Sequence, residues 1–373
     1  MTAILVVNAG SSSLKAGVFD AALVQAAASV VTEIGGAAMI GDRPVAAPDH
    51  AAAMAQVLEG LAQAGWPVTR LTAAAHRIVH GGATLTTPCR LTPGILAEIT
   101  ALIPLAPLHN PANLAAVHAL TALAPALPQY ASFDTAFHAT IPPVAHRYAL
   151  PPEAEALGLR RYGFHGLSYA AMVAGWDGPL PDRLLAYHLG NGASACAILR
   201  GRSVATTMGY SPLDGLTMGT RCGEIDGNAV LRLAEVHGIA GAARILNRES
   251  GLLGLGGASD MRVLAAAGTE RAAFARAHFA YWAVRHGASL VAAMGGLDAV
   301  AFTGGIGEHD AGIRAAILDG LTFLGATFDP AANAAGRAEI HSAASHVAIR
   351  LVPAREERQI AAEALQVMAG EGL

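Results

Sequence analysis

Two turns rich in glycine and serine lie between apolar segments, at Gly10–Ser13 and at Gly190–Gly192. Such turns expose backbone N–H groups with no side chain to block approach, and concave arrays of these groups bind phosphate oxygens. In the first turn, Ser11 and Ser13 add hydroxyl donors and the nearby Lys15 adds a positive charge. The residue types therefore favour phosphate binding, although tight structural turns use the same residues.

A third glycine-rich segment, Gly304–Gly307, follows the apolar run Ala299–Thr303 and leads toward a helical pattern around 311–318. Lys15 is the only lysine among 24 basic residues. It is either a chance survivor or a position that needs a compact ammonium group rather than a planar guanidinium. Three glycine-rich segments and this lysine together favour phosphate sites over simple turns.

The elements around these turns predict an α/β protein, because apolar strand patterns alternate with helical ones. The first turn leads into a strand rather than a helix, which excludes a Rossmann fingerprint. The chain also lacks the Gly-Lys-[Ser/Thr] of a Walker P-loop. The two strand–turn–strand segments lie about half a chain apart, which suggests a duplicated domain. The Pro-rich stretch after Leu150 places the boundary between domains 1–150 and 151–355.

Two long helices are predicted from apolar residues at spacings of three and four. In 269–294 the repeating positions include Phe274, Tyr281 and Val291. In 356–373 they include Ile360 and Met368, and this last helix is expected to pack back on the first domain.

The composition excludes several classes of protein. The 373 residues are 53% hydrophobic and 14% charged with a net charge of -4, so neither a disordered chain nor a polycation for nucleic acid is expected. The N-terminus lacks the basic region of a secretory signal, and no apolar run reaches the roughly 20 residues of a membrane span. Three distant cysteines fit a reducing cytoplasm.

Nine short segments together resemble the acetate kinase family, in the order in which that family carries them. They are Asn8–Lys15, His76–Gly82, Ala106–Pro111, Phe133–His138, Arg161–Gly166, His188–Gly192, Met218–Gly223, Asp260–Arg262 and Phe302–Glu308. The resemblance implies two duplicated actin-like ATPase (ribonuclease H-like) domains with the nucleotide in the cleft between them. It also implies a homodimer and the Mg²⁺-dependent transfer of the ATP γ-phosphoryl group to acetate, giving acetyl phosphate and ADP, with Mn²⁺ as a possible substitute.

The chemistry of this transfer can be reasoned from the acceptor. A carboxylate is already ionised near neutral pH and needs no general base. An anion that attacks a polyanion instead needs cations around the transferring group. The resemblance makes Arg77 a clamp on the acid and makes Arg221 and His165 stabilisers of the phosphoryl group. Asp134, at an apparent strand end, is expected to organise either Mg²⁺ or a neighbouring arginine.

The remaining roles are carried over by the resemblance, position by position. The acid pocket falls on the apolar residues Val79, Leu108, Phe164 and Pro212. The nucleotide contacts fall on Ser11, Ser13, Lys15, His188, Leu189, Gly190, Asn191, Gly192, Asp260, Met261, Arg262, Gly305, Ile306, Gly307, Glu308 and His309. The metal falls on Asn8 and Glu356, with Glu357 as an alternative ligand.

Alternatives to an acetate-specific kinase remain open at this point. Because one methylene is worth only about 1–3 kcal/mol of discrimination, propionate or butyrate could be the preferred acid. A different class is an actin-like or chaperone-like ATPase that uses the nucleotide to switch conformation, and its ATP turnover would not depend on an acid. A non-enzymatic scaffold would leave three phosphate-binding turns without a use.

Overall fold

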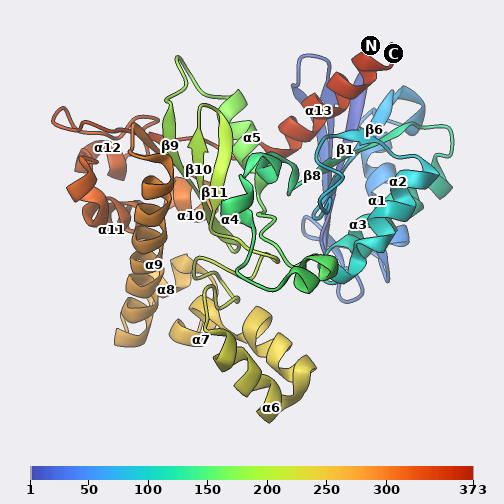
Figure 1. Ribbon diagram of the computed structural model, residues 1–373. Helices are drawn as coiled ribbons and strands as arrows, with labels where there is room; N and C mark the ends of the chain where they lie inside the picture. Colours follow the sequence, from blue (N-terminus) through green and yellow to red (C-terminus); the bar gives the residue numbers. More distant parts are fainter. Residues whose placement is uncertain (1, 373) are drawn as a thin grey trace. The chain divides into compact units, whose positions relative to one another are not determined.

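The computed structural model describes residues 2–372 and divides them into two compact units (Figure 1). The first unit runs to Phe137 and includes the segment from Arg355 onward, and the second is His138–Ala354. The sequence placed this boundary after residue 150. Residues 138–150 belong to the second unit because their side chains bond there: His138 Nδ1 lies 2.8 Å from Ser203 Oγ, and Thr140 donates to the Ser203 carbonyl.

The first unit is built on a sheet with the strand order β5-β4-β3-β2-β1-β6-β8-β7. Strands β1 and β2 form the predicted hairpin, and β1, β6 and β8 run parallel to one another. The strands are β1 (Ala3–Ala9), β2 (Leu14–Asp20), β3 (Gln25–Thr32), β4 (Met39–Ile40), β5 (Arg43–Pro44), β6 (Ala73–Ile78), β7 (Cys89–Arg90) and β8 (Gln129–Phe133).

Helices cover both faces of this sheet. Alternate residues of β1, such as Leu5 and Val7, pack with Met54 and Leu120 of helices α1 (His50–Gln63) and α3 (Asn110–Leu123). Helix α13 (Glu356–Gly370) contacts β1, β6 and β8, so the end of the chain belongs to this unit. The shorter helices are α2 (Pro93–Ala101), which packs on α3, and η2 (Ile103–Leu105).

The second unit has a sheet of order β11-β10-β9-β12-β13. Its strands are β9 (Arg183–Leu189), β10 (Ala193–Leu199), β11 (Arg202–Thr206), β12 (Ala299–Thr303) and β13 (Ala348–Leu351). The antiparallel β9–β10 and β10–β11 pairs and the parallel β9–β12 and β12–β13 pairs repeat the pattern of β3-β2-β1-β6-β8. This repeat confirms the predicted α/β class with duplicated ribonuclease H-like sheets.

The helices of the second unit carry the loops of the site. They are α4 (Pro143–His146), α5 (Gly166–Ala174), α6 (Gly227–Arg244), α7 (Gly251–Gly256), α8 (Met261–Ala266), α9 (Glu270–Met294), α10 (Gly304–His309), α11 (Ala311–Leu321) and α12 (Pro330–Ala334). Helix α9 packs on β9, β10 and β11, whereas α5 contacts β9. The Tyr187 hydroxyl of β9 donates to the Ala283 carbonyl of α9, and Ser168 of α5 bonds to His188 of β9.

The long helix predicted at 269–294 is confirmed as α9, but the predicted apolar face is only partly buried. Phe274 and Tyr281 are 58% and 62% exposed, whereas the predicted Val291 is buried together with Phe279, Ala283 and Leu290. The buried side is rich in alanine and glycine because the helix lies close to the sheet: a Cβ at Gly287 would stand 1.8 Å from the Tyr187 hydroxyl. Small residues thus mark the packed face here.

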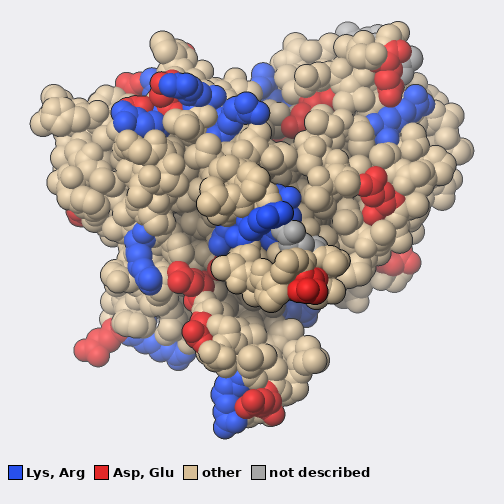
Figure 2. All heavy atoms as spheres, viewed as in Figure 1, with Lys and Arg blue, Asp and Glu red and all other residues tan. Residues whose placement is uncertain are grey.

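The space-filling view (Figure 2) shows how charged side chains are distributed on one face of the molecule. On the face drawn in Figure 2, uncharged residues cover most of the area, and Lys, Arg, Asp and Glu side chains lie among them in small mixed groups. None of the helices within residues 2–372 has the length and apolar character that crossing a bilayer requires.

Candidate active site

The parallel strands of the first unit bring three of the predicted site residues together. Asn8 lies near the end of β1, Arg77 near the end of β6, and Asp134 directly after β8. Because the three strands run in the same direction, their carboxyl ends meet at one edge of the sheet. The backbone N–H of Asp134 donates to the Ile78 carbonyl at 3.1 Å, which fixes Asp134 beside the end of β6.

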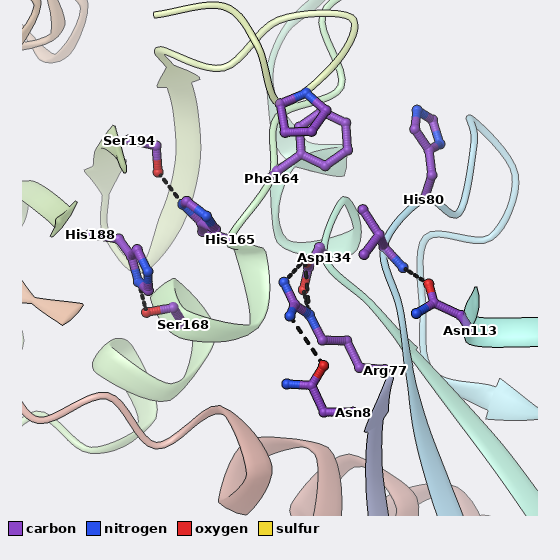
Figure 3. Close-up of polar contacts among 12 residues, drawn as sticks. Asn8, Arg77, His80, Asn113, Asp134, Phe164, His165, Ser168, His188 and Ser194 are labelled. Atoms are coloured by element: carbon purple, nitrogen blue, oxygen red, sulfur yellow. Dashed lines mark hydrogen bonds and ion pairs between the residues drawn. The ribbon is translucent and has the colours of Figure 1, made fainter. Parts of the chain in front are cut away.

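Arg77 is bound by a forked ion pair (Figure 3). Its Nε donates to Asp134 Oδ1 at 3.0 Å, its Nη2 donates to Oδ2 at 2.5 Å, and its Nη1 reaches Asn8 Oδ1 at 3.3 Å. The side chain of Asp134 is 2% exposed and that of Arg77 is 21% exposed. Burial raises the pKa of Asp134, and the Arg77 guanidinium opposes that rise. Of the two roles left open for Asp134, the structure shows the contact with an arginine.

Lys15 and Glu356 also belong to the first unit. Lys15 is the register partner of Asn8, so their side chains share a face, and the lysine is exposed. Glu356 and Glu357 form the first turn of α13. Burial disfavours the charged form of Arg77, but Asp134, Glu356 and Glu357 together outweigh it and raise the pKa of Arg77. The carboxylates of α13 therefore lie within electrostatic range of the Arg77 guanidinium.

Two buried asparagines that the sequence analysis missed hold the loop after β6. The amide of Asn113 accepts from the Val79 N–H at 3.0 Å and donates to the Ala9 carbonyl at 2.7 Å. The amide of Asn110 bonds to both the N–H and the carbonyl of His80, each at 3.1 Å. Asn110 lies within the Ala106–Pro111 segment that resembles the family. No sequence pattern indicated a role for Asn113, because its partners are distant in the sequence.

The two predicted acid-pocket residues of the first unit differ in exposure. Val79 is buried beside the Asn113 amide, whereas Leu108, which lies between η2 and α3, is 45% exposed. The predicted nucleotide residues Ser11 and Ser13 lie in the β1–β2 turn, where the Gly10 N–H donates to the Ser13 carbonyl. His50 closes this turn through a 2.7 Å bond to the Gly10 carbonyl.

In the second unit, His165 and Arg221 both approach the turn between β9 and β10. A Cβ placed on Gly192 would stand 3.1 Å from His165 Nε2 and 3.7 Å from Arg221 Nη1. A side chain at this position would therefore displace the imidazole, and glycine leaves the space between the two groups open. The sequence predicted both residues and the turn, and the structure brings all three together.

The loop that carries Arg221 is fixed by its backbone. Thr220 and Met218 accept from the N–H groups of Ser250 and Leu252 at the start of α7, at 3.0 and 2.8 Å. Arg221 Nη1 donates to the Pro212 carbonyl at 2.8 Å. Pro212 was predicted as an apolar wall of the acid pocket, and the contact that the structure shows for it is this carbonyl, which orients the guanidinium.

His165 begins helix α5 with an unusual backbone. Its φ of 59° lies in the left-handed region, which is costly for a residue with a side chain and is found at sites where the surroundings fix the conformation. Its Nδ1 lies 2.8 Å from Ser194 Oγ of β10, and its ring lies 4.1 Å from that of His188 (Figure 3). The neighbouring Phe164 is buried, and its carbonyl accepts from His138 Nε2 at 2.9 Å.

A cavity of about 1000 Å³ adjoins this turn within the second unit. It is lined by Gly190, Asn191, Ser259, Asp260, Met261, Arg262, Ala265, Ala266, Gly305, Ile306, His309, Asp310 and Ala311. Eight of these were predicted as nucleotide contacts: Gly190, Asn191, Asp260, Met261, Arg262, Gly305, Ile306 and His309. Asp260 caps α8 and pairs with the exposed Arg262 at 2.6 Å, and this pairing lowers the pKa of Asp260 to about 2.

Other predicted nucleotide residues face elsewhere. Glu308 Oε1 accepts from the Gly304 N–H at 3.1 Å and the Ala354 N–H at 2.9 Å, so this carboxylate joins α10 to the segment before α13. Leu189 and Gly307 are buried, and His188 bonds to Ser168. The sequence analysis missed Arg276, which pairs with Asp310 at 2.8 Å and reaches the Met261 carbonyl, holding α8 and α11 at the cavity.

The arrangement in each unit suits a defined chemistry. The second unit places a guanidinium and an imidazole beside a turn that also lines a large cavity, which fits a bound polyanion with its terminal group at these two donors. The first unit places a guanidinium, an ammonium and an amide at a strand edge, where an anion or a metal–anion complex can bind.

Comparisons with known proteins agree with this chemistry. A profile of the Acetokinase family matches residues 3–362. An acetate kinase from Rhodopseudomonas palustris is 45% identical, over 96% of this chain and 96% of that protein. A propionate kinase from Francisella tularensis superposes with a TM-score of 0.90 at 33% identity, over 97% and 99% of the two chains. An acetate kinase from Porphyromonas gingivalis gives 0.88 at 34% identity, over 99% and 100%.

The match over nearly the whole chain, at an identity well above 30%, leaves one conclusion. The chain belongs to the Acetokinase family.

Proposed function

We propose that this protein transfers the γ-phosphoryl group of ATP to acetate, giving acetyl phosphate and ADP. One structural observation supports this reaction in addition to family membership. The turn Gly190–Gly192 lines the 1000 Å³ cavity through its first two residues, while its third lies against His165 Nε2 and Arg221 Nη1. A nucleotide in the cavity would thus present its terminal phosphate to two donors. We place the enzyme in the cytoplasm, where ATP is available.

The proposed roles of the residues follow from the charges of the groups that they bind. Acetate arrives ionised, so no group needs to remove a proton, and the barrier lies in bringing an anion to a polyanion. Arg77, held by Asp134, binds the carboxylate through the part of its guanidinium that remains exposed. Arg221 and His165 stabilise the phosphoryl group during direct in-line transfer, and Lys15 with Ser11 and Ser13 binds phosphate oxygens.

A magnesium ion fits the first unit. Within residues 2–372 no three side chains of the types His, Cys, Asp and Glu gather into a metal cluster. Mg²⁺ usually keeps several waters and takes few protein ligands, often sharing them with phosphates. Asn8 and Glu356, or Glu357 in its place, supply oxygen donors near Arg77. When bound, the ion would neutralise charge on the phosphates.

The preferred acid is set by fit rather than by charge. Val79, Leu108, Phe164 and Pro212 are the proposed walls, and a difference of one methylene changes binding by only about 1–3 kcal/mol. The solved structure from Francisella tularensis carries the name propionate kinase. Propionate is therefore the alternative acid, and butyrate follows it.

An acyl hydroxamate assay tests the proposal. The protein is mixed with Mg-ATP, hydroxylamine and acetate, propionate or butyrate, and the coloured hydroxamate is measured. We expect product with acetate at the highest kcat/KM, less with propionate and least with butyrate. The highest rate with propionate would reassign the acid. ATP turnover that ignores the added acid would instead support a conformational-switch ATPase.

We further propose that the enzyme is a homodimer, on the basis of exposed apolar side chains in the second unit. Leu231, Val236 and Ile239 project from α6, and Phe274 and Tyr281 project from α9. Large apolar groups in such number on two helices are typical of an interface. Sedimentation velocity at micromolar concentration should give twice the 37.8 kDa mass of the chain, and a single-chain mass would exclude the dimer.

A further inference from the structure

Two hydrogen bonds connect Tyr169 of α5, through Ser194 of β10, to the imidazole of His165. Tyr169 of α5 is fully buried, and its hydroxyl lies 2.6 Å from Ser194 Oγ of β10. Ser194 Oγ in turn lies 2.8 Å from His165 Nδ1. Burial raises the pKa of the Tyr169 phenol well above its usual value, so the phenol keeps its proton.

The direction of these bonds follows from the acidity of the two hydroxyl groups. A phenol is more acidic than a serine hydroxyl and is the better donor, so Tyr169 donates to Ser194 Oγ, 2.6 Å away. A serine oxygen that accepts from Tyr169 still has its own proton, which it can donate to His165 Nδ1 at 2.8 Å. A neutral imidazole that accepts at Nδ1 has its proton on Nε2.

We propose that Ser194 and Tyr169 are positioning residues that hold neutral His165 as the Nε2–H tautomer, so that its donor faces the transferring phosphoryl group. The inference rests on the proposed role of His165. Nε2 is the ring atom at the Gly192 turn, close to Arg221 Nη1. The opposite tautomer would aim a lone pair at phosphoryl oxygens and repel them, whereas an N–H stabilises the charge that they carry.

The surroundings leave the ring little freedom to turn. The left-handed backbone of His165 sets where its side chain leaves α5, and the His188 ring covers one of its sides at a centroid distance of 4.1 Å. His188 is held separately, through Nδ1 and Ser168 Oγ at 2.8 Å. The fold already fixes the position of the His165 ring. Ser194 therefore determines which of its two nitrogens carries the proton.

The molecule contains a matched serine–histidine pair that serves as a control. Ser203 Oγ lies 2.8 Å from His138 Nδ1, the same distance as in the Ser194–His165 pair, and both serines are buried. In this pair, however, His138 Nε2 donates to the Phe164 carbonyl at 2.9 Å. A carbonyl only accepts, so His138 keeps its Nε2 proton whether or not the serine is present.

The direct test is the ¹⁵N NMR spectrum of the histidine side chains, with His165 assigned by its loss in His165→Gln. In the parent enzyme at pH 8, the shifts of His165 should show a protonated Nε2 and a bare Nδ1. Ser194→Ala should convert this pattern to a mixture of tautomers, while Ser203→Ala should leave every tautomer as in the parent. If His165 carries its proton on Nδ1, or if its shifts are the same in Ser194→Ala, the inference is wrong.

The pH dependence of kcat provides a second test, because a purely structural role of Ser194 would not change it. Ser194→Ala should lower kcat about tenfold at pH 8, the equivalent of one ordinary hydrogen bond, with the KM for acetate within twofold of the parent. At low pH the imidazole of either protein is doubly protonated and donates from Nε2, so the difference in kcat should close. Ser194→Thr, which keeps the hydroxyl, should restore the rate. If the kcat of Ser194→Ala is lower than that of the parent by the same factor at every pH, the proposal is wrong.

Tyr169→Phe provides a variant that keeps the ring in the core and removes only the hydroxyl. Ser194 would then be free to reverse its bond, so we expect a partial mixture of His165 tautomers and a smaller loss of kcat. The NMR result does not depend on catalysis. A tautomer shift in a protein without acid-dependent activity would contradict the proposed function alone, and full activity with an unresponsive tautomer would contradict this inference alone.

Discussion

Arg221→Ala should lower kcat for acetyl phosphate formation by about 10³-fold, the effect typical of an arginine that neutralises a phosphoryl group in transit. The guanidinium approaches the Gly192 turn beside His165 Nε2 and is oriented by the Pro212 carbonyl. The fold should survive, because the loop is held by backbone bonds from Ser250 and Leu252 that alanine leaves intact. Steady-state kinetics with saturating ATP and acetate, alongside thermal unfolding, measure both effects.

Arg271→Ala is the matched control for this substitution. Its guanidinium also donates to main-chain carbonyls of the second unit, those of Leu255 at 2.7 Å and Gly254 at 2.8 Å, without approaching the Gly192 turn. We expect its kcat to remain near that of the parent. If Arg221→Ala raises only the KM for acetate and leaves kcat unchanged, Arg221 binds the acid rather than the phosphoryl group.

Arg77→Ala should raise the KM for acetate by about 10²-fold or more and also destabilise the protein. Removing one member of a buried ion pair costs about 3 kcal/mol, because the other charge stays buried without its partner. Here that charge is Asp134, whose side chain is 2% exposed and whose pKa burial already raises. Urea unfolding and acetate titration measure the two effects separately.

The pH dependence of this loss has a definite sign. Without Arg77, the pKa of Asp134 in the folded state should rise further above its unfolded value. A carboxyl group whose pKa is higher in the folded protein than in the unfolded chain lowers the free energy of unfolding as the pH rises from the unfolded pKa to the folded pKa. In that range the unfolded chain has released the proton, whereas the folded protein still holds it. The variant should therefore recover part of its lost stability, relative to the parent, when the pH is lowered from 8 to 5.

Two further variants separate binding from stability. The double variant Arg77→Ala/Asp134→Ala should regain stability, because no buried charge remains, but it should not regain acetate affinity. Arg183→Ala breaks another forked arginine–aspartate pair, that with Asp298, whose side chains are 38% and 32% exposed. Its loss of stability should be much smaller than that of Arg77→Ala, because solvent screens an exposed ion pair. An Arg77→Ala enzyme with the parental KM would show that Arg77 is structural.

Local sequence patterns determined much of this protein. The β1–β2 and β9–β10 hairpins are confirmed at the two predicted turns, because two apolar runs joined by a short glycine-containing turn favour a hairpin between neighbouring segments. Helices α9 and α13 are confirmed in the predicted segments, and the predicted positions Ile360, Ala364 and Met368 of α13 are buried, together with Ala361. The ordered motifs were sufficient to indicate the family.

Tertiary structure decided the features that depend on partners far apart in the chain. The buried side of α9 is set by how closely the helix approaches Tyr187, which periodicity cannot reveal when the packed residues are alanine and glycine. The carboxylate of Glu308 bonds to backbone N–H groups rather than facing the cavity, because Gly304 and Ala354 lie within its reach.

Some residues of the site could be predicted from local sequence motifs, whereas others could be found only in the folded structure. Arg77, Arg221 and His165 were predicted from the resemblance of the short motifs around them to those of the family. Asn113, Ser194 and Tyr169 could not, because each acts through a hydrogen bond to a residue 25 or more positions away. A sequence determines which charges are present and which local turns form, but only the folded chain decides which donor faces which acceptor, since that depends on packing across strands and helices.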